Sequence, residues 1–387
     1  MTSSIALQAL LAVRPQLGAV VTAGAALGLE HYELLHAGPP LLDPRQPPRP
    51  LRSSIVMTCL HEGWVESEAQ AESLLSNGTL RLRPAQSFVC ATPLFAVISA
   101  GTPLFEVRDE AGGLSSYAPV GAVRGVDTRM GARDPGLIGR LRYRDLQIAP
   151  ALQHLLNQTG PIALWPLAIA GLALGDDLHS RTTGANDALV ALVRAQGNVA
   201  LADDIGATPL FFLTLWMAAA QLVLRAAEGG DLANLITRAG GNGEQFGIAL
   251  AQDPDTWVTC PAGSPQGPRL PHLTSDVTVS GAAGDSALID VLGFGGQRLA
   301  HAPEPFNALQ SFLPLQQVPH SRDLLLAPQP TLPDGWPLGI DAGRLAANGL
   351  SPIVMLAMVA ADGLTGLVGR GVYQPPVSLF GRAATQG

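Results

Sequence analysis

The chain is organised around one short polar stretch, Gly175-Asp176-Asp177-Leu178-His179-Ser180-Arg181. It brings two carboxylates, an imidazole and a guanidinium together more densely than any other part of the sequence. Apolar segments flank it at residues 161–174 and 184–193, and we expect both to be buried. Charged groups between two buried segments need partners or a ligand. The stretch therefore predicts a functional site at the junction of two core elements.

The spacing of its four ionisable residues fits a helix. On a helix, Asp176 and His179 would share one face. Asp177 and Arg181 are four residues apart and would share the neighbouring face. One pair would orient the imidazole for acid–base chemistry, and the other would direct the guanidinium at an anion. The alternative is an ordinary helix start with one aspartate as N-cap, but a cap needs only one acid.

The composition indicates a globular protein with a large buried fraction. Of 387 residues, 47% are hydrophobic and 14% are charged, and the formal net charge is −8. No basic run or aromatic-interleaved basic patch occurs, so we expect no nucleic-acid partner. Residues 205–224 approach bilayer length, but Pro209 and Gln221 interrupt them. We expect a buried core helix there, no membrane association and a cytoplasmic protein.

The sequence contains no lysine, so all 23 of its Lys and Arg positions are arginine. This excludes a lysine Schiff base and a Walker A lysine. An anionic substrate would be held by arginine, by backbone N–H groups or by a metal. The cysteines Cys59, Cys90 and Cys260 are too far apart for a zinc knuckle or a disulfide framework. No clustered metal ligands occur, and we expect neither a metal nor a cofactor.

Hydrophobic periodicity predicts an α+β fold in which two strand-containing units flank a central helical block. We expect three domains, at residues 1–130, 131–240 and 241–387. The segments on which this division depends include strands predicted at 55–60, 245–250, 256–259 and 286–291, and helices predicted at 65–77, 177–196 and 231–239.

Other polar or glycine-rich motifs are further candidates. Residues 240–243, Gly-Gly-Asn-Gly, are expected between a helix and a strand, where they would form either an anion nest or a simple helix C-cap and turn. Residues 281–286 offer an acid and a hydroxyl at a glycine turn. Glu62 would be a base, a ligand or a solvated loop acid. His36, beside Gly38, would either bind a ligand or simply turn the chain.

Taken together, these motifs resemble the YlbE/YahG-like family of bacterial proteins, over nearly the whole chain. The motifs that carry the resemblance are Leu35-His36-Ala37-Gly38-Pro39-Pro40, Glu62-Gly63-Trp64 with Glu68-Ala69-Gln70, the stretch at 175–181, Thr237-Arg238 with Asn242-Gly243 and Phe246-Gly247-Ile248, Pro265-Gln266-Gly267, and Gly284-Asp285-Ser286-Ala287. The family includes the large subunit of the oxamate carbamoyltransferase of anaerobic allantoin breakdown. The resemblance implies a role in purine catabolism and transfer of a carbamoyl group between phosphate and an amide nitrogen.

The resemblance also implies a set of site residues. The residues expected to be catalytic are Asp176, Asp177, His179 and Arg181. The residues expected to bind a small anionic substrate are His36, Gly38, Glu62, Asn242, Gly243, Gln266, Gly267, Asp285, Ser286 and Arg344. One aspartate would orient His179 as general acid–base, and Arg181 with Arg344 would hold a carboxylate or phosphate.

Several polar positions of the family differ in this chain. Gln86-Ser87 stands where relatives have a histidine pair, and residues 119–122 replace an Asn-Glu-Gly segment. We therefore keep two alternatives beside a carbamoyltransferase that works as a homo-oligomer or with other subunits. One is a non-catalytic scaffold or regulatory subunit. The other is a hydrolase or cyclising enzyme acting on another amide.

Overall fold

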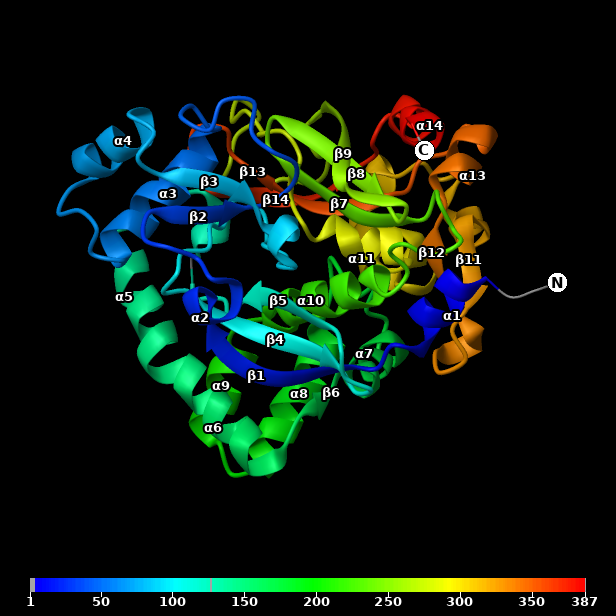
Figure 1. Cartoon of the computed structure of the whole chain (residues 1–387), viewed down its shortest axis with the longest axis horizontal. Helices are drawn as coiled ribbons and strands as arrows, with labels where there is room; N and C mark the ends of the chain where they lie inside the picture. Colours follow the sequence, from blue (N-terminus) through cyan, green and yellow to red (C-terminus); the bar gives the residue numbers. More distant parts are fainter. Residues whose placement is uncertain (1–3, 126, 387) are drawn as a thin grey trace.

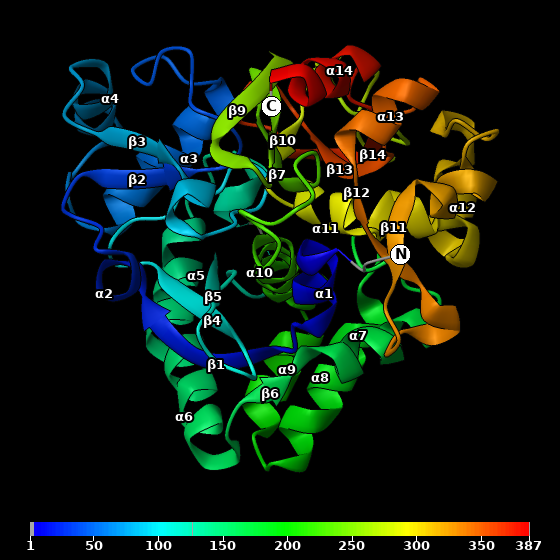
Figure 2. The same cartoon turned by 45° about the vertical axis from the view of Figure 1, so that its right-hand side comes forward.

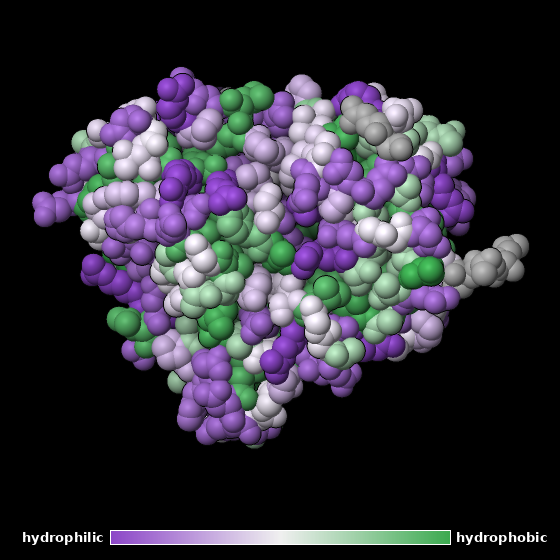
Figure 3. All heavy atoms as spheres, in the orientation of Figure 1, coloured by the Kyte–Doolittle hydropathy of each residue, from purple (hydrophilic) through white to green (hydrophobic). Residues whose placement is uncertain are grey.

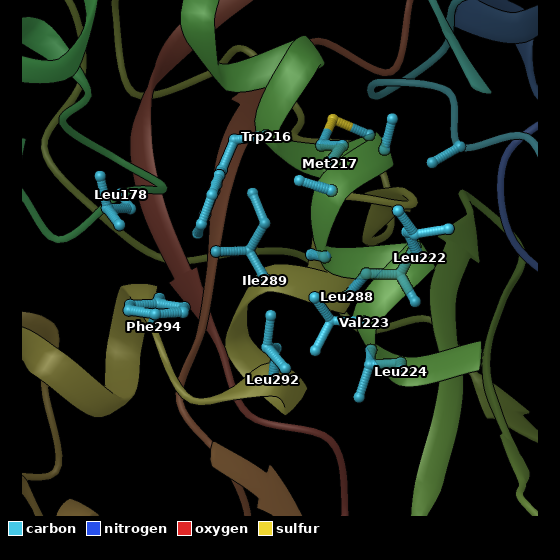
Figure 4. Packing of buried hydrophobic residues seen from close by; sticks show 14 of the residues in the cluster. Leu178, Trp216, Met217, Leu222, Val223, Leu224, Leu288, Ile289, Leu292 and Phe294 are labelled. Atoms are coloured by element: carbon cyan, nitrogen blue, oxygen red, sulfur yellow. The ribbon is translucent and has the colours of Figure 1, made fainter. Parts of the chain in front are cut away.

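A buried helix, α10 (Phe211–Arg225), lies at the centre of the computed structural model, which describes residues 4–125 and 127–386. Every residue of α10 except Arg225 is buried. A helix that is apolar on all sides has to be enclosed by other elements. In α10, Trp216 and Leu222 pack toward Leu288 and Ile289 of α11 (Ala287–Leu292), as Figure 4 shows. The expectation of a buried core helix is confirmed for residues 211–224, whereas residues 205–206 of the expected helix end α9.

Two four-stranded antiparallel sheets lie on opposite sides of α10 (Figures 1 and 2). The lower sheet has the order β5-β4-β1-β6 and consists of β1 (Pro15–Thr22), β4 (Pro103–Asp109), β5 (Ser115–Pro119) and β6 (Ile162–Ala163). The upper sheet has the order β10-β7-β8-β9 and consists of β7 (Ile236–Asn242), β8 (Gln245–Leu250), β9 (Asp253–Pro261) and β10 (Ala283–Gly284). Each sheet buries one face against the central helix.

The remaining described strands form three two-stranded sheets. β2 (Glu33–His36) pairs in parallel with β3 (Arg81–Pro84), β11 (Leu325–Pro328) is antiparallel to β12 (Pro337–Ile340), and β13 (Val354–Val359) is antiparallel to β14 (Leu367–Tyr373).

The remaining helices surround the sheets. They are α1 (Ile5–Ala12), α2 (Ala23–Leu27), α3 (Arg49–His61), α4 (Glu68–Ser76), α5 (Leu137–Tyr143), α6 (Ala149–Thr159), α7 (Leu164–Ala173), α8 (Thr183–Ala195), α9 (Val199–Gly206), α12 (Pro303–Leu309), α13 (Ala342–Asn348) and α14 (Val377–Gln386). Short helical turns that matter below are η2 (Thr128–Met130), η4 (Gly295–His301), η6 (Val318–Leu324) and η7 (Pro333–Gly335).

The α+β class is confirmed, and the elements of the three expected domains are joined. β6 belongs to the expected helical block but pairs with β1 of the N-terminal unit. The expected boundary at residue 240 falls within β7. One hydrophobic cluster extends from Ala6 to Ala383. Strand pairing and the core thus cross the expected boundaries at residues 130 and 240, and the division into three domains stays a prediction.

Three local predictions were wrong. Residues 55–60, predicted as a strand, form the second half of α3 because Pro50 sits in the first turn and starts a helix there. Of residues 286–291, also predicted as a strand, Ser286 precedes α11 and the others lie within it. Within the helix predicted at 231–239, residues 231–235 form no helix and residues 236–239 belong to β7. Short apolar runs do not distinguish helix from strand by themselves, and the neighbouring elements decided each case.

The face of the molecule in Figure 3 is mostly hydrophilic. Hydrophobic residues gather in a band across its middle, between the part with the lower sheet and the part with the upper sheet. In the described part of the chain, no single helix is long and apolar enough to cross a bilayer. α9 and α10 meet the length and composition test only as a pair, and they are bent by 85° where Pro209 separates them.

Because α10 is central, shortening one of its buried side chains should strongly lower the free energy of unfolding. Leu215 on α10 is fully buried, so Leu215→Ala should lower the free energy of unfolding by about 2–5 kcal/mol. Leu364 is 64% exposed in the turn between β13 and β14, and Leu364→Ala should change it by no more than about 0.5 kcal/mol. Urea unfolding of both variants measures the difference. Equal effects would contradict the central role of α10.

Candidate functional site

The polar stretch at residues 175–181 is a loop between α7 and α8, so the predicted helix start at residue 177 was wrong. Leu178 adopts the left-handed conformation, with φ of 66°, and its N–H donates to the carbonyl of Arg181 at 3.1 Å. Its side chain is fully buried, in the core seen in Figure 4. The loop therefore turns its polar residues around one buried leucine, and the expected sharing of helix faces does not occur.

Asp177 holds this loop in place. One carboxylate oxygen accepts from the backbone N–H groups of His179 and Arg181, at 3.1 and 2.8 Å. The other accepts from the hydroxyl of Ser180 at 2.7 Å. Such side chain to backbone bonds offer the chain an alternative to a helix, which is the physical reason for the loop. The carboxylate of Asp177 is therefore engaged within the loop.

Asp176 has a similar structural task. Its Oδ2 accepts from the N–H of Ala185 at 2.9 Å, in the first turn of α8. Its Oδ1 lies 3.5 Å from Nη1 of Arg181. Burial raises the pKa of Asp176, while the backbone donors and Arg181 lower it. Neither Asp176 nor Asp177 contacts the imidazole of His179 through its carboxylate.

The acid that orients His179 is Asp290 on α11. Nδ1 of His179 lies 2.7 Å from Oδ2 of Asp290, and both side chains are buried. The other oxygen of Asp290 accepts from the N–H groups of Gly296 and Met355, at 2.9 and 3.2 Å. Burial raises the pKa of Asp290, and the adjacent imidazole lowers it. Since Nδ1 is engaged, Nε2 is the nitrogen left for a bound molecule.

Sequence reasoning did not select Asp290. It was counted among the residues of a predicted apolar strand, although a carboxylate within such a run is a signal that it has a buried partner.

His179 lies on the wall of a cavity of about 450 Å³. The lining is mostly apolar and includes Pro93, Leu94, Leu210, Leu213, Met355 and Leu356. Three arginines, Arg129, Arg181 and Arg370, also line it. Nη1 of Arg370 pairs with both oxygens of Glu304, at 2.8 and 3.0 Å. Nε of Arg129 is buried and has no hydrogen-bond partner within residues 4–125 and 127–386. An apolar pocket with a few convergent cationic groups suits a small anion.

Asp285 clamps two loops beside the cavity. Its Oδ1 accepts from the N–H of Gly38 at 2.8 Å and from Nε2 of Gln86 at 2.6 Å, and its Oδ2 accepts from the N–H of Thr92 at 2.9 Å. Burial raises its pKa to about 7, although these three donors lower it. The next residue, Ser286, lines the cavity. Asp285 therefore positions the wall and does not contact a ligand there.

The other predicted binding residues lie elsewhere. His36 is buried, its Nδ1 is 2.8 Å from the carbonyl of Ala37, and burial lowers its pKa to about 4. Glu62 accepts from the hydroxyl of Ser99 at 2.5 Å. Arg344 is exposed on α13 and is not part of the cavity wall.

The expected glycine loop at 240–243 is the end of β7 and its turn into β8, not a loop after a helix. Asn242 holds that turn by accepting from the N–H groups of Glu244 and Gln245 at 2.9 and 2.8 Å. The N–H of Gly243, whose φ is 90°, donates to the carbonyl of Ala282 at 3.0 Å.

At Gln266 and Gly267 the chain runs beside β14, with backbone hydrogen bonds of 2.8 Å in both directions between Gln266 and Val372. Of the predicted residues, only His179, Arg181 and Ser286 therefore meet at the cavity, where Arg129, Arg370 and Asp290 join them as residues that were not predicted.

The chain matches a family model described as oxamate carbamoyltransferase subunit AllG over residues 80–286, more than half of its length. Two proteins of Escherichia coli (strain K12) are similar to it. Oxamate carbamoyltransferase subunit AllG is 25% identical over 375 residues, which cover 92% of this chain and 88% of the relative. The uncharacterized protein YahG is 26% identical over 376 residues, which cover 92% of this chain and 79% of the relative.

A solved structure has the same fold. The crystal structure of a conserved protein of unknown function from Enterococcus faecalis V583 superimposes with a TM-score of 0.89 at 22% identity, covering 98% of this chain and 95% of that one. This similarity supports the arrangement of elements described above.

The buried state of Asp285 predicts a pH dependence of stability. Its pKa rises from an ordinary 3.8 when unfolded to about 7 when folded, so the folded protein binds more protons between these values. The contribution of this group to the free energy of unfolding therefore falls as pH rises from about 4 to about 7. Asp285→Asn removes this titration, so the wild-type stability relative to the variant should decline over that range.

Urea unfolding at several pH values measures this difference. Asp323→Asn is the matched control, because the side chain of Asp323 is 77% exposed. A wild-type advantage over Asp285→Asn that stays constant, or grows, with rising pH would show that Asp285 has no raised pKa in the folded protein.

Proposed function

This chain belongs to the family of the oxamate carbamoyltransferase subunit AllG, and from that membership we propose that it is a carbamoyl-transfer subunit whose reaction takes place in the cavity at His179. The observation that carries the proposal is the His179–Asp290 pair, at 2.7 Å, on the wall of a cavity that three arginines also line. An imidazole oriented by a buried carboxylate is the usual arrangement of a general acid–base.

The proposed substrates are a small amide acid of the oxamate type and carbamoyl phosphate. Both are anions, and a protein without lysine would hold them with arginine, with backbone N–H groups or with a metal. Arg181 is the best placed cation because its own ion pair with Asp176 is long, at 3.5 Å, and leaves its other donors for a ligand. A cavity of about 450 Å³ lies within the ordinary range for small-molecule sites.

In the proposed reaction, the amide nitrogen of the acceptor attacks the carbamoyl carbon. A nitrogen–carbon bond forms, and the bond from that carbon to the phosphate oxygen breaks. Nε2 of His179 takes the proton from the nitrogen and returns it to the departing phosphate, so that charge and protons balance. Asp290 stabilises the imidazolium between these two proton transfers. The reverse reaction uses the same groups in the opposite order.

A non-catalytic subunit is the second candidate. It is favoured by the use of Asp285 and Asn242 inside the fold, where they bind backbone and not the cavity. It is also favoured by the ion pair between Arg370 and Glu304, which occupies one of the three cavity arginines. The curated relative is described as a subunit, and in either case we propose that this chain works in an assembly with other subunits.

Ligand binding tests the position of the site. Arg181→Ala should weaken binding of oxamate and of carbamoyl phosphate by about 10-fold to 100-fold, since a charged hydrogen bond contributes about 1.5–3 kcal/mol. Arg194→Ala is the control, because Arg194 is exposed and pairs with Asp203 on the surface. Isothermal titration calorimetry measures both. Binding that is as tight in Arg181→Ala as in the wild type would place the site elsewhere.

The catalytic role of His179 requires a test of turnover. His179→Gln and Asp290→Asn should each lower the rate of carbamoyl transfer by the assembled enzyme about 10²-fold to 10⁴-fold, the usual contribution of a general acid–base. Oxamate binding should persist in His179→Gln, because the anion is held by arginine. A full rate in both variants, measured with Asp323→Asn as control, would favour the non-catalytic subunit.

A further inference from the structure

Two arginines and a histidine surround the buried indole of Trp336, outside the cavity at His179. We call Arg298, His301, Arg322 and Trp336 the Trp336 cluster. The guanidinium carbons of Arg298 and Arg322 lie 4.4 and 5.3 Å from the indole centroid. The ring of His301 meets the indole edge-on, at 5.2 Å between centroids. These side chains come from η4, η6 and the residue that follows η7.

Arg298 is a buried cation that forms no ion pair with any described residue. It is 5% exposed, and its Nε and Nη1 have no hydrogen-bond partner among the residues that the structure describes. Burial, and to a lesser extent the charge of Arg322, lower its pKa to about 10, although the charge of Asp334 acts in the opposite direction. Stacking on an indole offsets only part of the cost of a desolvated guanidinium. The unused N–H groups of Arg298 therefore need an acceptor.

The charges around the cluster are unbalanced. Asp334 is the acid whose charge acts on both Arg298 and His301, and its side chain is exposed. Arg322 binds the backbone carbonyl of Asp334 at 2.9 Å, not its carboxylate. Burial and the two arginines lower the pKa of His301, so that it offers a neutral ring near pH 7. The cluster therefore has two positive charges, and the one acid beside it, Asp334, is solvated.

A second cavity, of about 530 Å³, reaches the cluster at His301. Its lining also includes Pro303, Glu304, Gly175 and Arg181. Because Arg181 and Glu304 also line the cavity at His179, the two cavities share a charged wall. A ligand at His301 would thus lie close to the proposed reaction site.

We propose that the Trp336 cluster binds an oxyanion of the phosphate class, either inorganic phosphate or the phosphoryl group of a larger ligand. Several oxygens on one centre satisfy the unused donors of Arg298 and those of Arg322 at once, which a single carboxylate does less completely. The neutral ring of His301 adds a donor on the wall of the second cavity. The site depends on these residues alone and does not require that the chain transfer a carbamoyl group.

The test follows Trp336 during titration with inorganic phosphate. The chain has five tryptophans, so labelling their indoles with ¹⁵N gives five signals, and Trp336→Phe identifies the one of interest. Nε1 of Trp336 donates to the carbonyl of Gly293 at 2.8 Å, which makes its signal sensitive to the cluster. We expect a saturable shift with phosphate and none with chloride at the same ionic strength.

Variants separate this site from the cavity at His179. Arg322→Gln, at an exposed position, should weaken phosphate binding at Trp336 about 10-fold to 100-fold, while oxamate binding stays unchanged. Arg298→Lys, which keeps the charge but removes the planar fork, should also weaken it. Arg194→Gln is the surface control. Arg181→Ala should leave the Trp336 shift in place.

Three results would overturn the proposal. They are an equal shift with chloride, a shift that Arg181→Ala abolishes, and a phosphate affinity that neither cluster variant changes. Comparison of phosphate with AMP distinguishes the two sources of the anion. Tighter binding of AMP identifies the phosphoryl group of a larger ligand, and tighter binding of phosphate identifies the free anion.

Discussion

The buried carboxylate of Asp290 joins the segments that form one side of the cavity. One of its oxygens binds the backbone of η4 and of β13, and the other binds His179 in the loop between α7 and α8. Burying a carboxylate away from water costs several kcal/mol of stability unless its oxygens accept hydrogen bonds. All three segments therefore have to be in place in the folded protein. Because α11 carries Asp290 and packs on α10, the position of the imidazole depends on the central core.

Other buried acids organise backbone in the same way. Asp177 holds the loop around Leu178, and Asp285 holds Gly38 and Thr92. Each accepts from several donors at once, and in each case the donors belong to segments with irregular backbone. Loops cannot satisfy their N–H groups from within as helices do, so a buried acid is an efficient partner for them. The acids thereby shape the cavity wall, and the imidazole and the arginines remain for a ligand.

The arginines differ in how strongly they are already engaged. Arg370 places one nitrogen between both oxygens of Glu304, so a ligand would have to compete for it. Arg181 has only a long contact with Asp176. Arg298 has no ion partner in the described ranges 4–125 and 127–386. This gradient, from fully paired to unpaired, separates the guanidinium groups that support the fold from those that are free to hold an anion.

The sequence by itself determined the α+β class, the buried helix near residues 205–224 and the importance of the stretch at 175–181. Each of these rests on a local property: periodicity, a long run of apolar residues, or several ionisable groups within one turn of chain. Tertiary structure alone decided that Asp290 orients His179, because the two residues are 111 positions apart. It also decided that residues 236–242 form a strand, since a strand needs partners such as β8 and β10 that local pattern does not reveal.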